Sequence, residues 1–473
     1  MKKRLWEWLL AAVAVLLVPL VLLSFAFALP ARYDETYLAA LQDKTARLKT
    51  TAGKRIVLIG GSGAAFDVRS DLLEAELPEY RVVNLGLYAG LGTTVMLDLA
   101  LPDLRAGDVV LFLPEQSEQT LSTFFDAASL WQATDGTCPP LWRLNASERG
   151  AMLGAFPTYA AGKARLYLYR EKPTGDAIYA RRSFNAWGDM ACAGRDGNVM
   201  AGGFDPNMPI TFDPDGIDAD FVQAVNAFSA ACERKGVAVY FGFCPMNALA
   251  VSDAERARAG AYAEALQDRL VCPILGTPES AIWGPEWFFD TNFHLNTAGQ
   301  VAYTAQLAGL LKPLTGDSSL VSITVPEPPQ AQARTVYDGD NRDAACFTYE
   351  RTGEARRITG LTEQRLTKTN LTVPAAADGL PVTEIAADAF RNAAVLSSVT
   401  IGPNVAYLPD GLFAGCTALQ SIVLTNPHPE TLSVGQGLLD GTDAHILVPR
   451  EAFSRYAVNY FWSVYADRLR AAE

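Results

Sequence analysis

The sequence is poor in the residues that most metal and phosphate sites require. Its seven cysteines include no Cys-x-x-Cys pair and it has only three histidines, so no metal-ligand spacing is present. The turn at residues 60–63 lacks the third glycine of a dinucleotide-binding fingerprint, because residue 66 is Phe. No Lys-Ser/Thr pair follows this turn, as a P-loop would need. We therefore expect neither a metal nor an organic cofactor.

Positive charge is also scarce. The chain has 39 Lys and Arg against 52 Asp and Glu, which gives a formal net charge of −13. This balance argues against nucleic acid or anionic lipid as the main partner. The length of 473 residues predicts more than one domain.

Residues 1–30 combine a basic start with a long apolar run. Lys2, Lys3 and Arg4 precede the stretch Leu9–Leu29, which contains no charged residue. A helix of that length is about 30 Å long and matches a bilayer core. We interpret it as a single-pass membrane anchor with a cytoplasmic N-terminus and the bulk of the chain extracytoplasmic. A cleaved signal peptide is the alternative, because Ala26-Phe27-Ala28 resembles a cleavage site.

Composition and periodicity divide the remainder into segments. Strand and helix patterns alternate, which predicts an α/β fold with a parallel sheet and helices on both faces. An irregular region rich in aromatic residues interrupts this alternation, and its Cys138 and Cys192 are candidates for a disulfide. The predicted segments are a polar helical stalk (31–51), an α/β domain (52–315) with the irregular insertion (about 120–215), a proline-containing linker (316–344) and a repeat domain (345–473).

One serine lies at the edge where open α/β sheets bind their ligands. The β-branched and aliphatic residues of Arg55–Ile59 predict a buried strand of a parallel sheet. This strand ends in Gly60-Gly61-Ser62-Gly63, and helical composition follows from Ala64. Ser62 is therefore our candidate nucleophile.

A nucleophilic serine needs a base and a group that orients the base. His428 and His445 lie in the repeat domain, so only His294 belongs to the α/β domain. Asp290 precedes it by four residues, and a carboxylate on the same loop can fix the tautomer of the imidazole. Ser62, His294 and Asp290 are thus the candidate catalytic residues.

Together these motifs resemble the SGNH, or GDSL-type, hydrolase superfamily over roughly residues 52–312. The resemblance lies in Ser62 after the first strand, Asn84–Gly90 after the second, and the Asp…His pair at the end of the domain. It implies a flavodoxin-like three-layer sandwich and the hydrolysis or transfer of an ester, often an O-acetyl group on carbohydrate. It also implies an oxyanion hole formed by the backbone N–H groups of Ser62 and of Gly90 or Ala89.

Two positions depart from the pattern of that family. The spacing is Asp-x-x-x-His where the family usually has Asp-x-x-His. After the third strand the family supplies an Asn side chain to the oxyanion hole, whereas this chain has Glu115 and Gln116. A carboxylate would repel an oxyanion, so Gln116 is the expected donor. Losing one such donor typically costs about 10² to 10³ in rate.

The C-terminal part of the chain repeats itself. Residues 382–404 align without a gap with residues 405–427, and recurring apolar positions at this 23-residue period predict a solenoid of stacked units. The pattern resembles the BspA-type leucine-rich repeats of bacterial surface proteins, and residues 448–466 are similar to their usual C-terminal ending. This resemblance implies an extracellular binding or spacer module but names no ligand. We expect a protein or a glycan as the ligand of the repeats.

Two functions follow from these observations. The first is a membrane-anchored extracytoplasmic esterase or O-acetyltransferase that acts on cell-envelope or extracellular glycan. The second is a non-catalytic surface protein, in which a degenerate α/β scaffold displays the repeats. Geometry discriminates between them, because a catalytic pair requires Ser62 Oγ to lie within about 3 Å of a ring nitrogen of His294.

Overall fold

The computed structural model describes residues 17, 27–174, 178–200, 203–205, 208–329, 337–353, 355–435, 437–459 and 462–472. The chain forms two compact units. The first comprises residues 1–194, 210–283 and 293–327, and the second comprises residues 195–209, 284–292 and 328–473. We describe each unit by itself.

The first unit is built on a five-stranded parallel sheet. The strand order is β2-β1-β3-β4-β6, and every neighbouring pair in it is parallel. This is the 2-1-3-4-5 order of doubly wound folds. In such folds the order in which strands are added to the sheet switches from one side of β1 to the other, between β2 and β3. The strands are β1 (Lys54–Gly60), β2 (Tyr80–Asn84), β3 (Val109–Leu113), β4 (Ala238–Gly242) and β6 (Ile274–Leu275). The predicted α/β class with a parallel sheet is therefore confirmed.

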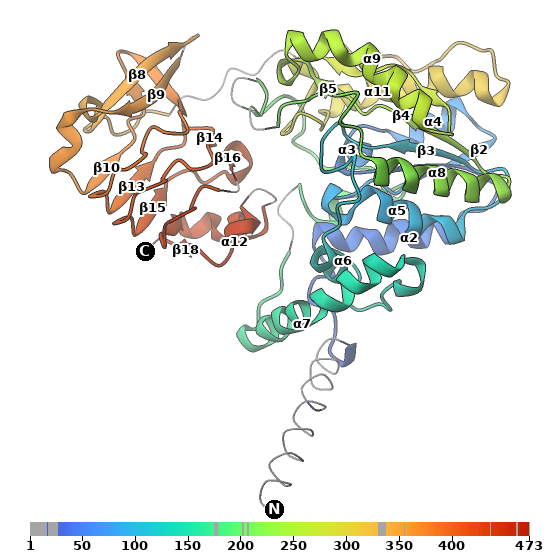
Figure 1. Cartoon of the computed structure of the whole chain (residues 1–473), viewed down its shortest axis with the longest axis horizontal. Coiled ribbons are helices and arrows are strands. Elements are labelled where there is room, and N and C mark those ends of the chain that lie inside the picture. Colours follow the sequence, from blue (N-terminus) through green and yellow to red (C-terminus); the bar gives the residue numbers. More distant parts are fainter. Residues whose placement is uncertain are drawn as a thin grey trace, which may run out of the picture. The chain divides into compact units, whose positions relative to one another are not determined.

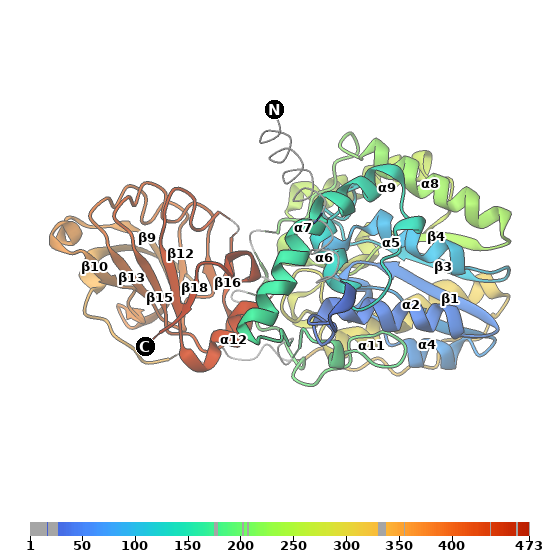
Figure 2. The ribbon, with the colours of Figure 1, turned by 90° about the horizontal axis from the view of Figure 1, so that it is seen from below.

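Helices pack on both faces of this sheet. Figure 2 shows α4 and α11 on one side of the strands and α5 and α8 on the other. Side-chain caps fix where several helices begin, because Asp218, Ser252 and Asn296 each accept a backbone N–H of the first turn. The helices are α4 (Ser70–Glu76), α5 (Thr93–Ala100), α8 (Ala219–Arg234), α9 (Asp253–Arg269) and α11 (Thr297–Leu311).

The segment expected to be a polar stalk is helical but is packed into the first unit. Helix α2 (Ala40–Thr50) buries Leu41, Lys44 and Leu48. The guanidinium of Arg47 donates to the carbonyl of Val82 in β2, at 2.9 Å from Nη2. The polar composition gave no sign of this packing, because a lysine such as Lys44 is normally expected to face water.

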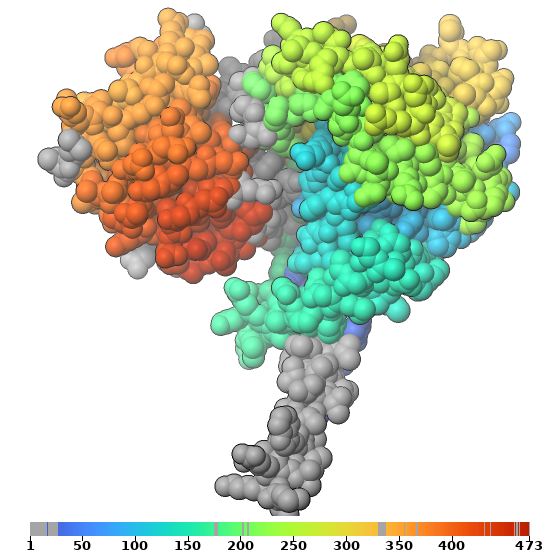
Figure 3. Space-filling view, in the orientation of Figure 1, coloured from blue at the N-terminus to red at the C-terminus, as the bar shows by residue number. Residues whose placement is uncertain are grey.

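The segment expected to be irregular contains two helices, α6 (Ala127–Ala133) and α7 (Ala146–Tyr169). Helix α7 begins with a capping box in which Asn145 and Glu148 bond reciprocally. It carries exposed Leu153 and Leu168, so its apolar residues follow no single face. Figure 3 shows this helix at the molecular surface, which explains why no clean periodicity marked it. No disulfide joins Cys138 and Cys192 in the structure.

The second unit contains a stack of parallel strands. The order β10-β13-β15-β17-β18 follows the sequence, and each neighbouring pair is parallel (Figure 1). Ser398 pairs with Ser421, so equivalent residues of the two 23-residue repeats lie side by side. The strands are β10 (Asn370–Thr372), β13 (Ser398–Ile401), β15 (Ser421–Leu424), β17 (His445–Val448) and β18 (Leu469–Ala471).

Smaller elements complete the two units. A four-stranded sheet precedes the stack, and the short helix α12 (Phe453–Val458) lies near its end. The sheet comprises β8 (Phe347–Thr352), β9 (Ala355–Leu361), β11 (Ala376–Ala377) and β12 (Leu380–Ile385). Two further pairs of strands form small sheets of their own: β14 with β16 (Tyr407–Leu408, Ser433–Val434) and β5 with β7 (Met246–Asn247, Ile282–Trp283). The remaining short helix is α10 (Pro278–Ala281). The end of the predicted linker (316–344) is part of the second unit, because the backbone of Tyr337 forms two hydrogen bonds with the side chain of Asn404.

The predicted membrane anchor lies almost entirely outside the described residues. Within the described part of the chain, no helix is long and apolar enough to cross a bilayer.

Candidate active site

Ser62 is held on the turn that the sequence predicts for it. Strand β1 is buried along Arg55–Gly60, and Ser62 is the first residue of the short helix α3 (Ser62–Phe66). Gly60 permits close approach of β3, because a Cβ at this position would overlap the carbonyl of Leu113. The turn therefore leaves Ser62 partly exposed beyond the carboxyl end of the central strand.

The structure brings His294 to Ser62. Nε2 of His294 lies 2.8 Å from Ser62 Oγ, although the two residues are 232 positions apart in the sequence. The Phe66 ring stacks on the imidazole with centroids 3.9 Å apart and an interplanar angle of 7°. Asp67 Oδ1 accepts the backbone N–H of Leu295 at 2.8 Å. The turn that carries the serine thus also holds the backbone beside His294.

A tyrosine lies at the other ring nitrogen of His294. The Tyr179 hydroxyl oxygen is 3.3 Å from Nδ1, and both side chains are buried. The Tyr179 ring also lies near Phe66, with centroids 5.8 Å apart. The sequence carried no signal for Tyr179, because it lies in the irregular region and no spacing links it to His294.

Asp290 is buried on the segment that leads to His294, with 4% of its surface exposed. Its role in orienting the imidazole stays a proposal beside the observed contact of Tyr179. Tyr179 is therefore a candidate for setting the tautomer in which Nε2 can accept the proton of Ser62.

Glu115 lies against the nucleophile. Its Oε1 accepts the backbone N–H of Gly63 at 2.7 Å and is 3.2 Å from Ser62 Oγ. Its Oε2 is buried and has no hydrogen-bond partner among the residues that the structure describes. Burial raises the pKa of this carboxyl group, and the Gly63 N–H and the nearby His294 act in the opposite direction. The side chain at this position therefore contacts the reacting serine directly.

Gln116, the expected oxyanion donor, points elsewhere. Its Nε2 donates to the carbonyl of Thr211 at 3.0 Å, and the side chain is buried. A Gln116 amide held in this way would have to break that bond before it could serve an oxyanion. No hydrogen bond between Gln116 and Ser62 is among those of the described residues.

The predicted backbone donors lie on the loop after β2. Ala89 and Gly90 belong to the 3₁₀ turn Ala89–Leu91, and the carbonyl of Gly90 accepts the N–H of Asp126 at 2.9 Å. Gly86 lets this loop approach α3, because a Cβ there would lie 2.6 Å from the backbone nitrogen of Ala65. The loop is thus packed against the turn of Ser62, which keeps Ala89 and Gly90 as candidate donors.

The arrangement can perform nucleophilic chemistry. The Ser62 hydroxyl can donate to Nε2 of His294, which is the pairing that removes the proton as the oxygen attacks. No group of three or more His, Cys, Asp or Glu suited to hold a metal ion occurs among the residues the structure describes. Cys232, Cys244 and Cys272 are buried.

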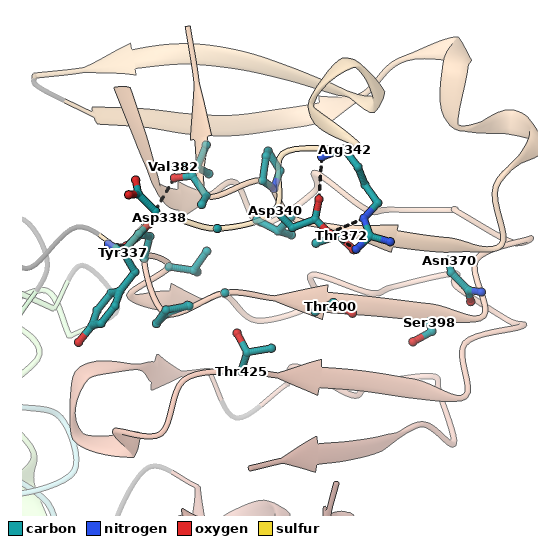
Figure 4. Close-up of a pocket in the computed structure, with 18 residues that line it drawn as sticks. Tyr337, Asp338, Asp340, Arg342, Asn370, Thr372, Val382, Ser398, Thr400 and Thr425 are labelled. Carbon is teal, nitrogen blue, oxygen red and sulfur yellow. Dashed lines mark hydrogen bonds and ion pairs between the residues drawn. The ribbon is translucent and has the colours of Figure 1, made fainter. Parts of the chain in front are cut away.

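The second unit has a separate groove of about 770 Å³. Figure 4 shows hydroxyl groups from neighbouring strands along it, among them Thr372, Thr400 and Thr425. Tyr337 and Asp338 line the same groove. Hydroxyl, amide and carboxylate groups of this kind can exchange hydrogen bonds with a polar ligand.

Comparisons with known proteins assign no family to the chain. No family model matches it, and no curated protein matches it. A leucine-rich repeat protein of T. pallidum is 22% identical and covers 26% of this chain and 47% of its own, with a TM-score of 0.17. A leucine-rich cell surface protein of Faecalibacterium prausnitzii is 20% identical, covers 25% of this chain and 34% of its own, and has a TM-score of 0.16.

Protein YxiM of Bacillus subtilis covers 56% of this chain and 58% of its own at 11% identity, with a TM-score of 0.27. The chain thus spans between about a third and just over half of the length of these three structures. Two of the three neighbours are leucine-rich repeat proteins. At these TM-scores the likeness carries no argument about function, which has to rest on the site itself.

Proposed function

We propose that this protein is a serine-dependent esterase or O-acyltransferase that acts on ester-modified glycan outside the cytoplasm. The observation that carries the proposal is the 2.8 Å separation between Ser62 Oγ and His294 Nε2. A degenerate scaffold has no need to keep these two side chains in hydrogen-bond contact over such a sequence separation. The distance therefore favours the catalytic function over the non-catalytic one.

The reaction follows from the positions of the side chains. His294 takes the proton of Ser62 as Oγ attacks the acyl carbonyl, and then returns it to the leaving alcohol. Water or a sugar hydroxyl, deprotonated by the same imidazole, resolves the acyl-enzyme into an acid or a new ester. In this scheme Asp290 and Tyr179 are candidate groups for holding His294 with its proton on Nδ1.

Covalent labelling tests the nucleophile. We expect a fluorophosphonate probe to label the folded wild-type protein, and we expect the label to vanish in Ser62→Ala and to fall strongly in His294→Ala. Ser122→Ala is a matched control, because this partly buried serine bonds to its own loop, at the Gln119 carbonyl and the Phe124 amide. Absence of labelling in a wild-type protein with an intact unfolding transition would overturn the proposal.

We further propose that the second unit binds glycan or protein on the cell surface and that the N-terminal apolar run anchors the chain. The groove lined by Thr372, Thr400 and Tyr337 supports a polar ligand. Binding of soluble cell-wall glycan should weaken in Tyr337→Ala but not in Val395→Ala, whose side chain is 48% exposed and does not line the groove. Removal of residues 1–30 should move the protein from the membrane fraction to the soluble fraction.

A further inference from the structure

The position of Glu115 conflicts with the chemistry expected of a carboxylate. Oε1 lies 3.2 Å from Ser62 Oγ, so the carboxyl group is beside the point at which a substrate carbonyl would be attacked. A tetrahedral intermediate carries its negative charge on an oxygen bonded to the same carbon as Oγ. An ionised Glu115 would repel that charge, whereas a neutral carboxylic acid has one O–H group to donate.

The surroundings of Glu115 favour the neutral acid. The residue is 3% exposed, and within the described part of the chain Oε2 has no hydrogen-bond partner. A buried carboxylate usually needs partners for both oxygens, because its charge loses its hydration. Here Oε1 accepts the Gly63 N–H and lies 3.2 Å from Ser62 Oγ, whereas Oε2 has no such neighbour among the described residues. Burial accordingly raises the pKa of Glu115.

Three other titratable groups face this carboxyl group. His294 favours ionisation of Glu115 when the imidazole is protonated. The Cys244 thiol has its own pKa raised by burial, with Asp67 and Glu115 adding to the rise, so it stays neutral. Asp67 is the third group, because its Oδ2 and the Cγ of Glu115 would each lie 3.3 Å from a Cβ at Gly63.

We propose that Glu115, as a neutral carboxylic acid, donates a hydrogen bond to the oxyanion that forms when Ser62 attacks an ester. The inference rests on the proposed function. Glu115 would then supply the hydrogen bond that an Asn side chain supplies in the family that the chain resembles. Gln116 would not be needed as a donor and could remain bonded to the carbonyl of Thr211. It also replaces the expectation that Glu115 is excluded from the oxyanion hole.

The step balances without any further reactant. The Ser62 O–H bond breaks and its proton moves to Nε2 of His294, while a bond forms between Oγ and the acyl carbon. The carbonyl π electrons move to oxygen, where the Glu115 O–H donates without transferring its proton. When the intermediate collapses, the bond to the leaving alcohol breaks and His294 gives that alcohol its proton.

The role predicts a distinctive dependence on pH. The active form needs a neutral imidazole and a neutral Glu115, so the rate of acylation should rise as His294 loses its proton and fall as Glu115 ionises. Glu115→Gln keeps an N–H donor at the same position but cannot ionise. We therefore expect this variant to retain acylation within about tenfold of wild type and to lose the fall at high pH.

The test measures the burst of p-nitrophenolate from p-nitrophenyl acetate across pH in the full chain. At pH values where Glu115 is neutral, Glu115→Ala should lose about 10² to 10³ in the acylation rate, because one oxyanion donor is gone. At high pH, where wild type has also lost this donor, the two rates should converge. Glu118→Gln, an exposed neighbour, is the matched control and should follow the wild-type profile. Infrared difference spectra provide a readout that needs no turnover: the spectrum of wild type minus that of Glu115→Gln should contain the C=O stretch of a protonated carboxylic acid.

The outcomes separate this inference from the proposed function. If wild type gives no Ser62-dependent burst at any pH, the proposed function fails, and the infrared band still decides whether Glu115 is neutral. If wild type gives the burst but Glu115→Gln is as slow as Glu115→Ala, or keeps the wild-type fall at high pH, the inference alone is overturned. Recovery of activity in Glu115→Gln together with a flat profile at high pH supports it.

Discussion

The hydroxyl oxygen of Tyr179 lies 3.3 Å from Nδ1 of His294, the ring nitrogen that does not face Ser62. For Nε2 to accept the serine proton, Nδ1 has to carry the proton of the neutral imidazole, and the Tyr179 oxygen can accept that N–H. The contact joins an unpredicted residue of the irregular region to the predicted base.

Tyr179→Phe should lower kcat/KM by about 3- to 10-fold, because a hydrogen bond of this kind contributes about 0.5–1.5 kcal/mol net. The loss should fall on kcat, since the tyrosine acts through His294 and leaves substrate binding unchanged. Tyr169→Phe, whose parent residue is 68% exposed on α7, is the control. Asp290→Asn in the same assay decides between the two candidates: a fall of about 10⁴ would assign the orienting role to Asp290 instead.

Gly61→Ala should inactivate the site without unfolding the protein. A Cβ at position 61 would overlap the carboxyl group of Glu115, which would have to leave its place beside Ser62. We expect the fluorophosphonate labelling rate to fall by at least about 10², as for the loss of an oxyanion donor. Gly150→Ala has open space around its Cβ and should react at the wild-type rate.

A double mutant tests whether Gly61→Ala acts through Glu115. If the alanine acts only by displacing the carboxyl group, Gly61→Ala combined with Glu115→Ala should be no slower than Glu115→Ala alone. Fully additive losses would contradict this explanation and would assign the effect to the turn itself.

Lys44 should make stability depend on pH. It is 2% exposed, donates to the carbonyl of Asn84 at 3.2 Å, and burial lowers its pKa to about 7, with Asp189 opposing the shift. Between pH 7 and 10 the unfolded chain holds a proton on Lys44 that the folded protein lacks, so stability should rise with pH. The slope is at most about 1.4 kcal/mol per pH unit.

The measurement compares urea unfolding of the first unit in wild type and in Lys44→Met across this range. The free energy of unfolding of wild type relative to the variant should rise from pH 7 to 10 and level off below pH 7, where both states are protonated. Lys49→Met, which changes an exposed lysine of the same helix, should show no such dependence. A difference that stays constant with pH would contradict the assignment.

Phe413→Ala should destabilise the second unit by about 3–5 kcal/mol, because it deletes a fully buried ring. Phe413 packs against Phe390, the equivalent residue of the preceding repeat, with ring centroids 5.3 Å apart. Val395→Ala is the exposed control and should stay within about 0.5 kcal/mol of wild type. Limited proteolysis of residues 345–473 reports the change, and equal resistance of the two variants would refute it.

Much of the fold could be predicted because its signals are local. Strand β1 begins and ends within one residue of the predicted range. Helix α2 was predicted as a helix but not as a packed one, because it buries a lysine among polar residues. Helix α7 was not predicted, because it exposes leucines at the surface. A prediction that places every polar residue at the surface is wrong for residues such as Lys44, whose hydrogen bonds inside the protein replace those with water.

The sequence by itself determined the strand, turn and helix that present Ser62, and the 23-residue period that sets Ser398 beside Ser421. Both follow from neighbouring residues, whose backbone preferences and apolar spacing act locally. Only the tertiary structure decided that His294 reaches Ser62, that Tyr179 reaches His294 and that Glu115 lies beside the nucleophile. These contacts join residues 53 to 232 positions apart, and their geometry depends on how the strands and loops pack rather than on any spacing along the chain.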